Sequence, residues 1–476
     1  MLATVKGDVH DIGKNIVAVV LSCNNYEVED MGIMISADKI IAKVKEGNYD
    51  LLGLSGLITP SLEEMVYVAK ELEQNKLNIP LIIGGATTSK IHTAVKIAPA
   101  YSGIVVHVND ASRLVTVANQ LFSENTREQY VKDIKQQQQQ IRDEYYAKST
   151  ANTIIPIEEA RANRLKINWQ QTKIVKPSFL GNRYFVDFSL KKIVTYLDWN
   201  TFFHAWKIKG RYPELLNDAI YGTDAKKLFN DAQEMLNKII NEKLLLANAV
   251  IGFYPANSTG DDIVLYDDEK KINKLIIFNM LRQQSKHCDA TAHLSLADFV
   301  ASDESKVNDY IGIFACTTGI NIETAIKKLK KKNDDYEFIL LKILADRLVE
   351  AFAELLHLTV RKKLWAYSKN ENFILTDLFK KKYIGIRPAF GYSACPDHSE
   401  KFKLFDLLDV TAKTKIQLTE NAAMYPASSV CGLYLAHPQA KYFGLGKIGN
   451  DQLTCYAKRK NISLEEIDKW IKNVSS

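Results

Sequence analysis

The first 122 residues alternate short apolar runs with helical patterns, and this alternation is the strongest constraint on how the chain can fold. The apolar runs cover residues 2–7, 26–31, 51–57, 79–83 and 104–108, and a helical pattern follows each of them. Strands and helices that alternate at this spacing predict a doubly wound parallel sheet of five strands. Sheets of this kind bind ligands at the carboxyl ends of their strands, so functional residues are expected there.

The loop after the first predicted strand has the most distinctive sequence in the chain. It reads Gly7-Asp8-Val9-His10-Asp11-Ile12-Gly13, with the histidine two residues after the first aspartate. His10 can offer one imidazole nitrogen to a metal ion while Asp8 accepts the proton of the other, an arrangement that fixes the tautomer of a metal ligand. The loop therefore predicts a metal-ligating histidine at the edge of the sheet.

Three further strand ends carry hydroxyl groups or very small residues. These are Ser55, Thr59 and Ser61 after the third strand, Gly84 and Gly85 after the fourth, and Ala111 after the fifth. Paired glycines let a backbone approach a bulky group closely. Two simpler interpretations stay open, because Ser61 and Glu64 match a helix capping box and the glycine pair also suits a plain turn. The shared position of these residues on the same edge as His10 favours a binding site.

The pattern changes after residue 122. Residues 123–177 are predicted to form a polar linker that begins with a helix, and residues 178–476 a second domain. Amphipathic helices are expected there over 224–247, 322–330, 337–368 and 463–472, with strands at 249–254, 262–266 and 310–315. The expected fold class is thus α/β plus α+β: a flavodoxin-like, five-stranded parallel sheet over 1–122, followed by a larger mixed α+β domain.

The most informative part of the second domain is the segment 387–398, which two prolines and a glycine make a rigid, extended loop. Arg387 can bind a carboxylate through two parallel hydrogen bonds, and Asp198 and Glu350 supply negative charge. Aromatic faces for a planar or cationic group are offered by Tyr392, Tyr442 and Phe443. This set suits an amino-acid sulfonium ligand, although a surface turn with ordinary core aromatics is the simpler interpretation.

Composition argues against several other classes of protein. The 476 residues carry a net charge of +6, without the basic block and interleaved aromatics that are typical of nucleic-acid binding. No apolar run reaches the roughly 18 residues of a membrane helix. Six cysteines occur without a C-x-x-C pair, which favours a reducing, cytoplasmic location over a zinc site or a disulfide framework. We therefore expect neither nucleic acid nor a membrane as a partner.

Together these motifs resemble a known family. The D-x-H-x-x-G loop, the S-x-L sequence at 55–57 and the glycines at 84–85 are similar to the cobalamin-binding domain of corrinoid enzymes. Residues 7–15 and 55–61 most resemble the cobalamin-dependent methionine synthases. The R-P-A-x-G-Y-x-x-C-P sequence from 387 and the D-W-x-x-F-F sequence from 198 resemble the S-adenosylmethionine-binding activation domain of those enzymes. Three lysines at 380–382 depart from the family, which often has an acid there.

The resemblance implies a role for each candidate residue. His10 is implied to be the lower axial ligand of the cobalt, with Asp8 and Ser61 completing a catalytic relay. The residues implied to contact cobalamin are Gly7, Asp8, Val9, His10, Asp11, Gly13, Ser55, Thr59, Ser61, Gly84, Gly85 and Ala111. Those implied to contact S-adenosylmethionine are Asp198, Glu350, Arg387, Ala389, Tyr392, Tyr442 and Phe443.

The implied function is that of the carboxyl-terminal part of a methyltransferase that moves a methyl group from methyltetrahydrofolate to homocysteine. This part would bind cobalamin (methylcobalamin) and reactivate cob(II)alamin by reductive methylation from S-adenosylmethionine, with a flavodoxin-like electron donor as partner. The chain is expected to be a fragment or one part of a split enzyme, with homocysteine and folate domains possibly on another chain. The alternative is a non-catalytic cobalamin-binding carrier, a sensor or a corrinoid mutase subunit, which leaves the 387–398 loop unexplained.

Overall fold

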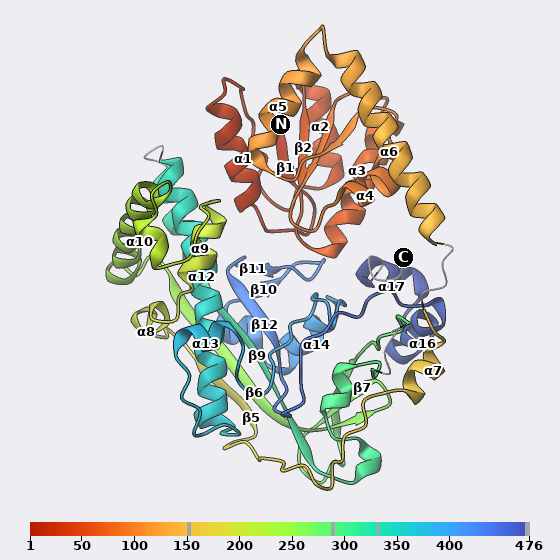
Figure 1. Cartoon of the computed structure of the whole chain (residues 1–476), viewed down its shortest axis with the longest axis vertical. Helices are drawn as coiled ribbons and strands as arrows, with labels where there is room; N and C mark the ends of the chain where they lie inside the picture. The colour runs from red at the N-terminus through yellow and green to blue at the C-terminus, as the bar shows by residue number, and fades with distance from the viewer. Residues whose placement is uncertain (150–153, 287–290, 331–333, 472–476) are drawn as a thin grey trace.

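The computed structural model describes residues 1–149, 154–286, 291–330 and 334–471. Within these residues, the first part of the chain folds around a parallel sheet of four strands in the order β1-β2-β3-β4 (Figure 1). The strands are β1 (Leu2–Thr4), β2 (Leu52–Ser55), β3 (Leu81–Gly84) and β4 (Val105–His107). All pairs are parallel, so the four carboxyl ends meet at one edge of the sheet. The predicted doubly wound α/β class is confirmed.

The predicted strand at 26–31 is wrong as a regular strand. Residues near it do lie beside β1, where the Leu2 N–H donates to the Glu29 carbonyl at 2.8 Å and the Met31 N–H to the Leu2 carbonyl at 2.9 Å. The pairing is interrupted because the Asp30 carboxylate accepts the Gly32 N–H at 2.8 Å and Gly32 adopts a φ of +91°. An irregular edge segment therefore takes the place of the fifth strand, and its position beside β1 keeps the flavodoxin-like strand order.

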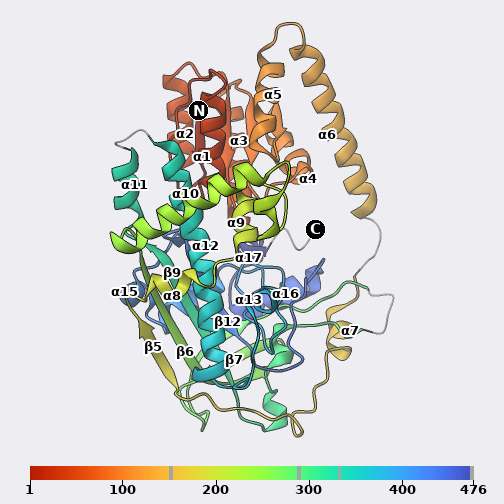
Figure 2. The same cartoon turned by 60° about the vertical axis from the view of Figure 1, so that its left-hand side comes forward.

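Helices cover both faces of this sheet (Figures 1 and 2). Helices α1 (Ile12–Ser22) and α5 (Ala111–Phe122) share an apolar core with Ile82 and Val106. Helices α2 (Ala37–Glu46) and α3 (Thr59–Gln74) share another with Ile83 and Val105. Because neighbouring strand residues point to opposite faces, each central strand supplies both cores.

Two shorter elements and a long helix complete the edge of the sheet beside β4. Helix α4 (Lys90–His92) continues as a π-helical turn, η1 (Thr93–Ile97). Helix α6 (Arg127–Ser149) then lies along the open side of β4. There the Gln138 side-chain amide donates to the Val105 carbonyl at 2.7 Å, so this helix pairs a backbone group that the edge strand would otherwise leave free.

The second part of the chain has the predicted mixed α+β class, and it is built on an antiparallel sheet. Strands β12 (Ser429–Tyr434), β9 (Asp309–Ile320), β6 (Leu246–Thr259), β7 (Asp262–Tyr266) and β8 (Lys274–Asn279) are neighbours in that order, and β5 (Gly181–Phe185) pairs with β6. Helices α10 (Gly222–Asn241) and α12 (Asp335–Thr359) pack on one face of this sheet. The other face packs on α14 (Glu400–Leu407) and α15 (Val410–Thr414).

Short elements surround this second sheet. They are α7 (Ile157–Ala162), α8 (Leu190–Val194), α9 (Trp199–Ala205), α11 (Ile322–Lys330), α13 (Leu375–Phe379), α16 (Asn450–Lys460), α17 (Leu464–Ile471) and the hairpin of β10 (Gln417–Leu418) and β11 (Met424–Tyr425). The helix predicted over 224–247 ends at Asn241, because the chain enters β6 at Leu246. The helix predicted over 337–368 ends at Thr359 and gives way to a π-helical turn, η6 (Val360–Leu364). The domain limits at 122 and 178 stay a prediction.

The two parts of the chain are in direct contact, because one end of α12 lies beside α1 (Figure 2). Lys342 on α12 donates to both carboxylate oxygens of Asp11, at 2.5 and 2.6 Å. The turn between β10 and β11 contacts the same loop, where the Thr419 hydroxyl donates to the Gly7 carbonyl at 2.7 Å. The Asn421 amide donates to the Lys6 carbonyl at 3.0 Å. The His10 loop is therefore held from both parts of the chain.

In the described part of the chain, no helix combines the length and the apolar character that crossing a membrane requires.

The ion pair between Asp11 and Lys342 should stabilise this docked arrangement. In a double-mutant cycle with Asp11→Asn and Lys342→Met, we expect a coupling energy of about 1–2 kcal/mol in urea unfolding. The matched control is the exposed pair Lys6–Glu420, 3.3 Å apart, whose coupling should stay below about 0.5 kcal/mol. Equal coupling energies for the two pairs would show that the enclosed position of Lys342 does not strengthen its ion pair with Asp11.

Candidate functional site: a histidine cavity and an arginine cavity joined by one helix

A buried carboxylate, Asp8, connects the loops that follow β1 and β2. Its Oδ2 accepts the Ser61 hydroxyl at 2.5 Å and the Leu57 N–H at 2.6 Å. Its Oδ1 accepts the His10 backbone N–H at 3.0 Å and lies 2.7 Å from His10 Nδ1. Burial opposes ionisation of Asp8, but the hydrogen bonds and the charge of His10, with the bonds from Ser61 and Leu57, outweigh it and lower the pKa to about 2. The carboxylate is therefore ionised at neutral pH.

This carboxylate sets the tautomer of His10. An ionised carboxylate only accepts hydrogen bonds, so Nδ1 carries a proton, and in the neutral tautomer that this contact selects the lone pair is on Nε2. The third member of the relay, Ser61, lies in the first turn of α3, which begins at Thr59 and has no side-chain cap. The capping-box interpretation of Ser61 and Glu64 is therefore wrong, because the hydroxyl of Ser61 is used by Asp8 instead.

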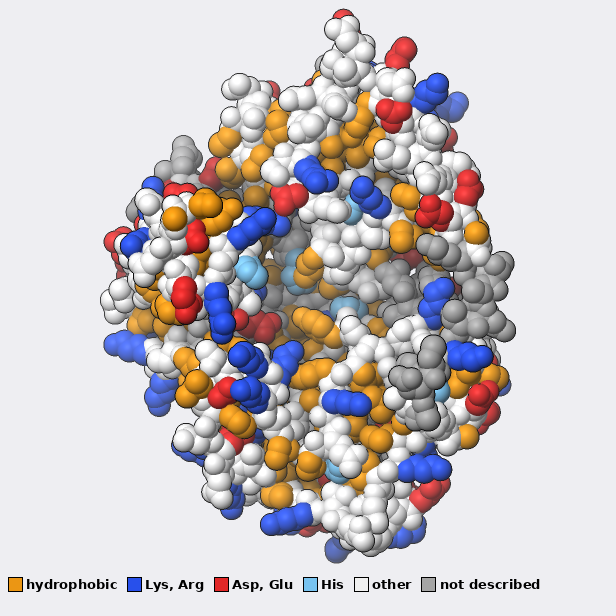
Figure 3. All heavy atoms as spheres, in the orientation of Figure 1, with side chains coloured by type: hydrophobic (Ala, Val, Ile, Leu, Met, Phe, Trp, Pro, Cys, Tyr) orange, Lys and Arg blue, Asp and Glu red, His pale blue; other side chains and the backbone are white. Residues whose placement is uncertain are grey.

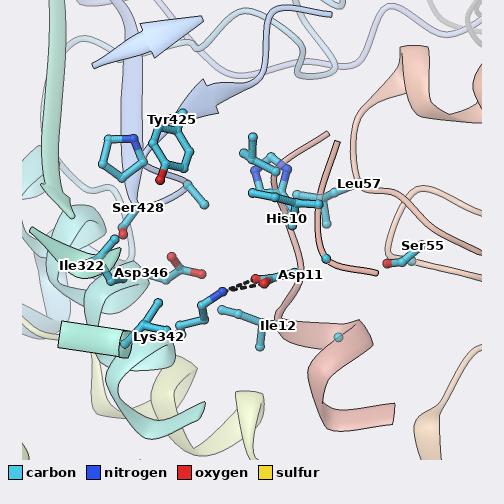
Figure 4. Close-up of a pocket in the computed structure, with 18 of the residues that line it drawn as sticks. His10, Asp11, Ile12, Ser55, Leu57, Ile322, Lys342, Asp346, Tyr425 and Ser428 are labelled. Carbon is cyan, nitrogen blue, oxygen red and sulfur yellow. Dashed lines mark hydrogen bonds and ion pairs between the residues drawn. The ribbon is translucent and has the colours of Figure 1, made fainter. Parts of the chain in front are cut away.

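His10 lines a cavity of about 430 Å³ between the two parts of the chain (Figures 3 and 4). The His10 loop forms one wall, and Tyr425, Ser428 and residues of α11 and α12 form the opposite wall. Figure 4 shows Lys342 and Asp346 of α12 on the far side of the cavity from His10, with Lys342 bonded to Asp11. Burial raises the pKa of Asp346 to about 6. The cavity thus holds a partly exposed imidazole and a carboxyl group that faces it from α12.

The structure gathers only part of the predicted cobalamin residues around this cavity. Those that line it are Val9, His10, Asp11, Gly13, Ser55 and Gly85. Gly7 and Asp8, at the start of the His10 loop, and Ser61 are buried. Thr59, Gly84 and Ala111 lie where α3 begins, β3 ends and α5 begins, all at the same edge of the sheet. The roles of these residues stay a prediction.

At this edge of the sheet, the position of Gly85 leaves no room for a side chain. It adopts a φ of +125°, and a Cβ atom there would lie 1.9 Å from the Gly56 carbonyl oxygen. Only glycine fits this position, because any side chain would collide with backbone. The two loops after β2 and β3 can therefore approach each other beside the cavity.

Two adjoining cavities in the second part of the chain collect the other predicted residues. One, of about 550 Å³, is lined by Glu350, Arg387, Ala389, Tyr392, Tyr442 and Phe443. The other, of about 260 Å³, is lined by Asp198, Glu350 and Arg387 among others. Because Glu350, Lys381 and Arg387 border both, the two form one bent site. Lys381, from the lysine triplet that departs from the family, places its Nζ 4.6 Å from the centre of the Tyr442 ring.

Arg387 is oriented by its neighbours and keeps a free donor. Its Nη2 donates to Glu354 Oε2 at 3.0 Å, and its backbone N–H donates to the Tyr442 hydroxyl at 3.0 Å. In the described part of the chain, the buried Nε of Arg387 has no hydrogen-bond partner. The Asp198 carboxylate accepts the Asn200 N–H at 3.0 Å and caps α9, so it already has a structural role. The arginine is thus prepared to bind an anionic group.

Sequence reasoning missed most of the residues that α12 supplies. Lys342 and Asp346 line the His10 cavity, whereas Glu350 and Glu354 line the Arg387 cavity. These four residues are spaced four apart, so they follow one side of the helix from one cavity to the other. Charged residues at that spacing in an otherwise apolar helix were a signal that could have found them.

Comparisons with known proteins agree with this arrangement. Residues 189–461 match the family model of the vitamin B12 dependent methionine synthase activation domain, and residues 1–106 match that of the B12 binding domain. The crystal structure of the MetH reactivation domain bound to AdoHcy is similar at 41% identity and a TM-score of 0.67, over 68% of this chain and 99% of that one. The chain belongs to the vitamin B12-dependent methionine synthases. A cobalamin-binding protein from Desulfitobacterium hafniense DCB-2 is 31% identical over 26% of this chain and 58% of its own, with a TM-score of 0.23.

The edge of the first sheet fits the cofactor that the family name implies. His10 presents an imidazole whose Nε2 can bind a metal, while Nδ1 is held by Asp8. Among the described residues, no three potential metal ligands come together. A single nitrogen suits a cobalt ion whose other positions a corrin ring fills, but it would not hold a bare metal ion.

The low pKa of Asp8 predicts an acid-dependent loss of stability. The pKa is lowered in the fold from the ordinary 3.8, so this group stabilises the native state above pH 4 and loses that effect as the pH falls toward 2. Relative to Asp8→Asn, the free energy of unfolding of the parent should fall by about 2 kcal/mol across this window. Urea titrations of the two proteins at several pH values measure the difference, with the exposed Asp133→Asn as a control. Parallel pH profiles for the parent and Asp8→Asn would contradict the ion-pair interpretation.

Proposed function

We propose that the chain binds cobalamin with His10 as the lower axial ligand of the cobalt and reactivates the cofactor by reductive methylation, with S-adenosylmethionine as the methyl donor. The observation that carries this proposal is the position of two cavities on one helix. The cavity of His10 and the cavity of Arg387 are both lined by α12, so a cofactor at the first would lie close to a ligand at the second. The similarity to a reactivation domain bound to AdoHcy, the demethylated product of S-adenosylmethionine, supports the choice of methyl donor.

The protein residues at the first cavity would control how His10 binds the cobalt, and they would not carry the methyl group themselves. Bound cobalamin would supply the cobalt centre that accepts an electron and then the methyl group. Asp8 holds the Nδ1 proton of His10 and is itself held by the Ser61 hydroxyl. Asp8 and Ser61 would hold the proton at His10 Nδ1 and so direct Nε2 toward the cobalt.

Each group of an amino-acid sulfonium ligand would have its own binding residues in the second cavity. Arg387, with its unpartnered Nε, would bind the carboxylate. Glu350 and Asp198 would face the ammonium group, and the rings of Tyr392, Tyr442 and Phe443 would pack against the adenine or the sulfonium. Glu354 would hold Arg387 in place by its ion pair. All of these residues except Glu354 were candidates from the sequence.

The wider activity follows from the family and is part of the proposal. A complete enzyme would move the methyl group from methyltetrahydrofolate to homocysteine, and its homocysteine and folate domains would be needed for turnover. A flavodoxin-like protein would supply the electron for reactivation. The alternative, a non-catalytic cobalamin carrier or sensor, is less well supported because it has no use for the Arg387 cavity.

Replacement of His10 by glycine should remove a protein nitrogen from the cobalt. In protein labelled with ¹⁵N-histidine, bound cob(II)alamin should show a doublet nitrogen splitting in its EPR spectrum, because ¹⁵N has spin one-half. The His10→Gly variant should lose this doublet, whereas the exposed control His204→Ala should keep it. A doublet that persists in His10→Gly, or a parent spectrum with only the ¹⁴N pattern of the cofactor's own base, would rule out His10 as the ligand.

Replacement of Arg387 by alanine should weaken binding of S-adenosylmethionine. Removing one member of a desolvated charge pair costs about 2–5 kcal/mol, which corresponds to roughly 30-fold to several-thousand-fold in affinity. Isothermal titration of the full chain with S-adenosylmethionine measures this change, and Arg183→Ala on β5, outside both cavities, is the matched control. An Arg387→Ala affinity within a few-fold of the parent would remove the methyl-donor site from the proposal.

A further inference from the structure

A separate small cavity lies on the far edge of the first sheet, between β4, η1, α5 and α6. Its volume is about 180 Å³, below the roughly 300–1,000 Å³ of sites for drug-sized ligands. Its polar lining includes Lys90, Thr93, His107, Asn109, Arg113 and Gln137, and the rest of the wall is formed by valine and isoleucine side chains with Tyr130 and Gln138. None of these residues lines the His10 cavity or the Arg387 cavity. The proposed cobalamin and S-adenosylmethionine sites therefore do not use it.

Two buried polar atoms at this cavity have no hydrogen-bond partner among the described residues. One is the hydroxyl oxygen of Thr93, a residue that is 1% exposed, and the other is His107 Nδ1. Buried polar groups in native proteins are nearly always paired, with protein, with water or with a ligand. Two unpaired atoms on the same small cavity therefore mark two positions at which a polar molecule could form hydrogen bonds.

The hydrogen bonds around His107 define which kind of group it needs. The Thr88 hydroxyl donates to the Gly85 carbonyl at 2.7 Å, so its oxygen is left to accept the proton of His107 Nε2 at 3.0 Å. His107 Nδ1 is then a bare acceptor. Burial, with a further contribution from the charge of Lys90, lowers the pKa of His107 and keeps the ring neutral. A partner at Nδ1 must therefore bring a donor such as a hydroxyl group.

The charged side chains define the rest of the ligand. Lys90 and Arg113 are the charged residues that line the cavity, and both are cationic. With no acid among the lining residues, the cavity has a positive potential that favours an anion. Arginine and lysine together are typical of sites that bind phosphate groups.

We propose that this cavity binds a small phosphate monoester that carries a free hydroxyl group. Arg113 and Lys90 bind the phosphate, the ligand hydroxyl donates to His107 Nδ1, and the Thr93 hydroxyl bonds to a second oxygen of the ligand. The valine and isoleucine wall contacts a short carbon chain between the two ends. A ligand of this kind pairs both unpaired atoms and brings a charge opposite to that of Lys90 and Arg113.

Binding of glycerol 3-phosphate to the full chain, first saturated with hydroxocobalamin, tests this assignment. Isothermal titration should show saturable binding of glycerol 3-phosphate and none of glycerol, which lacks the charge. Lys90→Gln, Arg113→Gln and Thr93→Val should each weaken the binding about tenfold or more, whereas Lys96→Gln, an exposed lysine on η1 outside the cavity, should leave it unchanged. In ¹⁵N-histidine NMR spectra, the Nδ1 resonance of His107 should move toward the hydrogen-bonded range as the ligand is added.

Three results would overturn the proposal. One is the absence of saturable binding in the cobalamin-saturated parent, with binding in the cobalamin-free chain only, because the phosphate would then occupy the cofactor site. Another is an equal loss of binding in Lys96→Gln and Arg113→Gln, which indicates nonspecific attraction to positive charge. The third is an unchanged affinity in Lys90→Gln and Arg113→Gln; since both residues are exposed, folding of these variants is not at risk.

Discussion

An ionised carboxylate with no exposed surface, Asp8, lies between the loops that leave β1 and β2, and it is surrounded by donors from His10, Leu57 and Ser61. Burial of a charge is tolerated only where hydrogen bonds and opposite charge replace the lost water. The path of the His10 loop, the position of Ser61 in the first turn of α3 and the tautomer of His10 therefore all depend on this one group. The carboxylate lies where the strand order reverses, which is the place where sheets of this class bind ligands.

A single helix connects this loop to the second half of the molecule. Helix α12 packs against the antiparallel sheet through its apolar side, and its charged residues at 342, 346, 350 and 354 form a stripe between the two cavities. The stripe begins with the ion pair to Asp11 and ends with the ion pair to Arg387. A rigid helix with these two end contacts fixes the distance between the imidazole and the arginine. The relative position of the two proposed ligands is therefore a property of α12.

Parts of the fold could be predicted because their signals are local. Alternation of apolar runs with helical patterns located the four parallel strands and the helices between them, since each element buries a face that its own neighbours in sequence define. The same reasoning failed at residues 26–31, where a side-chain turn at Asp30 and a positive φ at Gly32 break an otherwise strand-like run. It also left a helix cap open as an interpretation of Ser61, because a capping pattern is read over four residues and takes no account of a carboxylate elsewhere in the chain.

By itself, the sequence determined the order and type of most elements, the loop that carries His10 and the loop that carries Arg387. It could do so because hydrophobic periodicity and turn residues depend on residues that are close together in the sequence. Only the tertiary structure decided which side chains meet. Ser61 bonds a carboxylate 53 residues away, and Lys342 bonds one 331 residues away. Glu354, which belongs to no recognisable motif, bonds Arg387, which is 33 residues away in the chain. Contacts at such separations depend on how packed helices and sheets bring distant residues together, and no pattern within a short stretch of sequence contains that information.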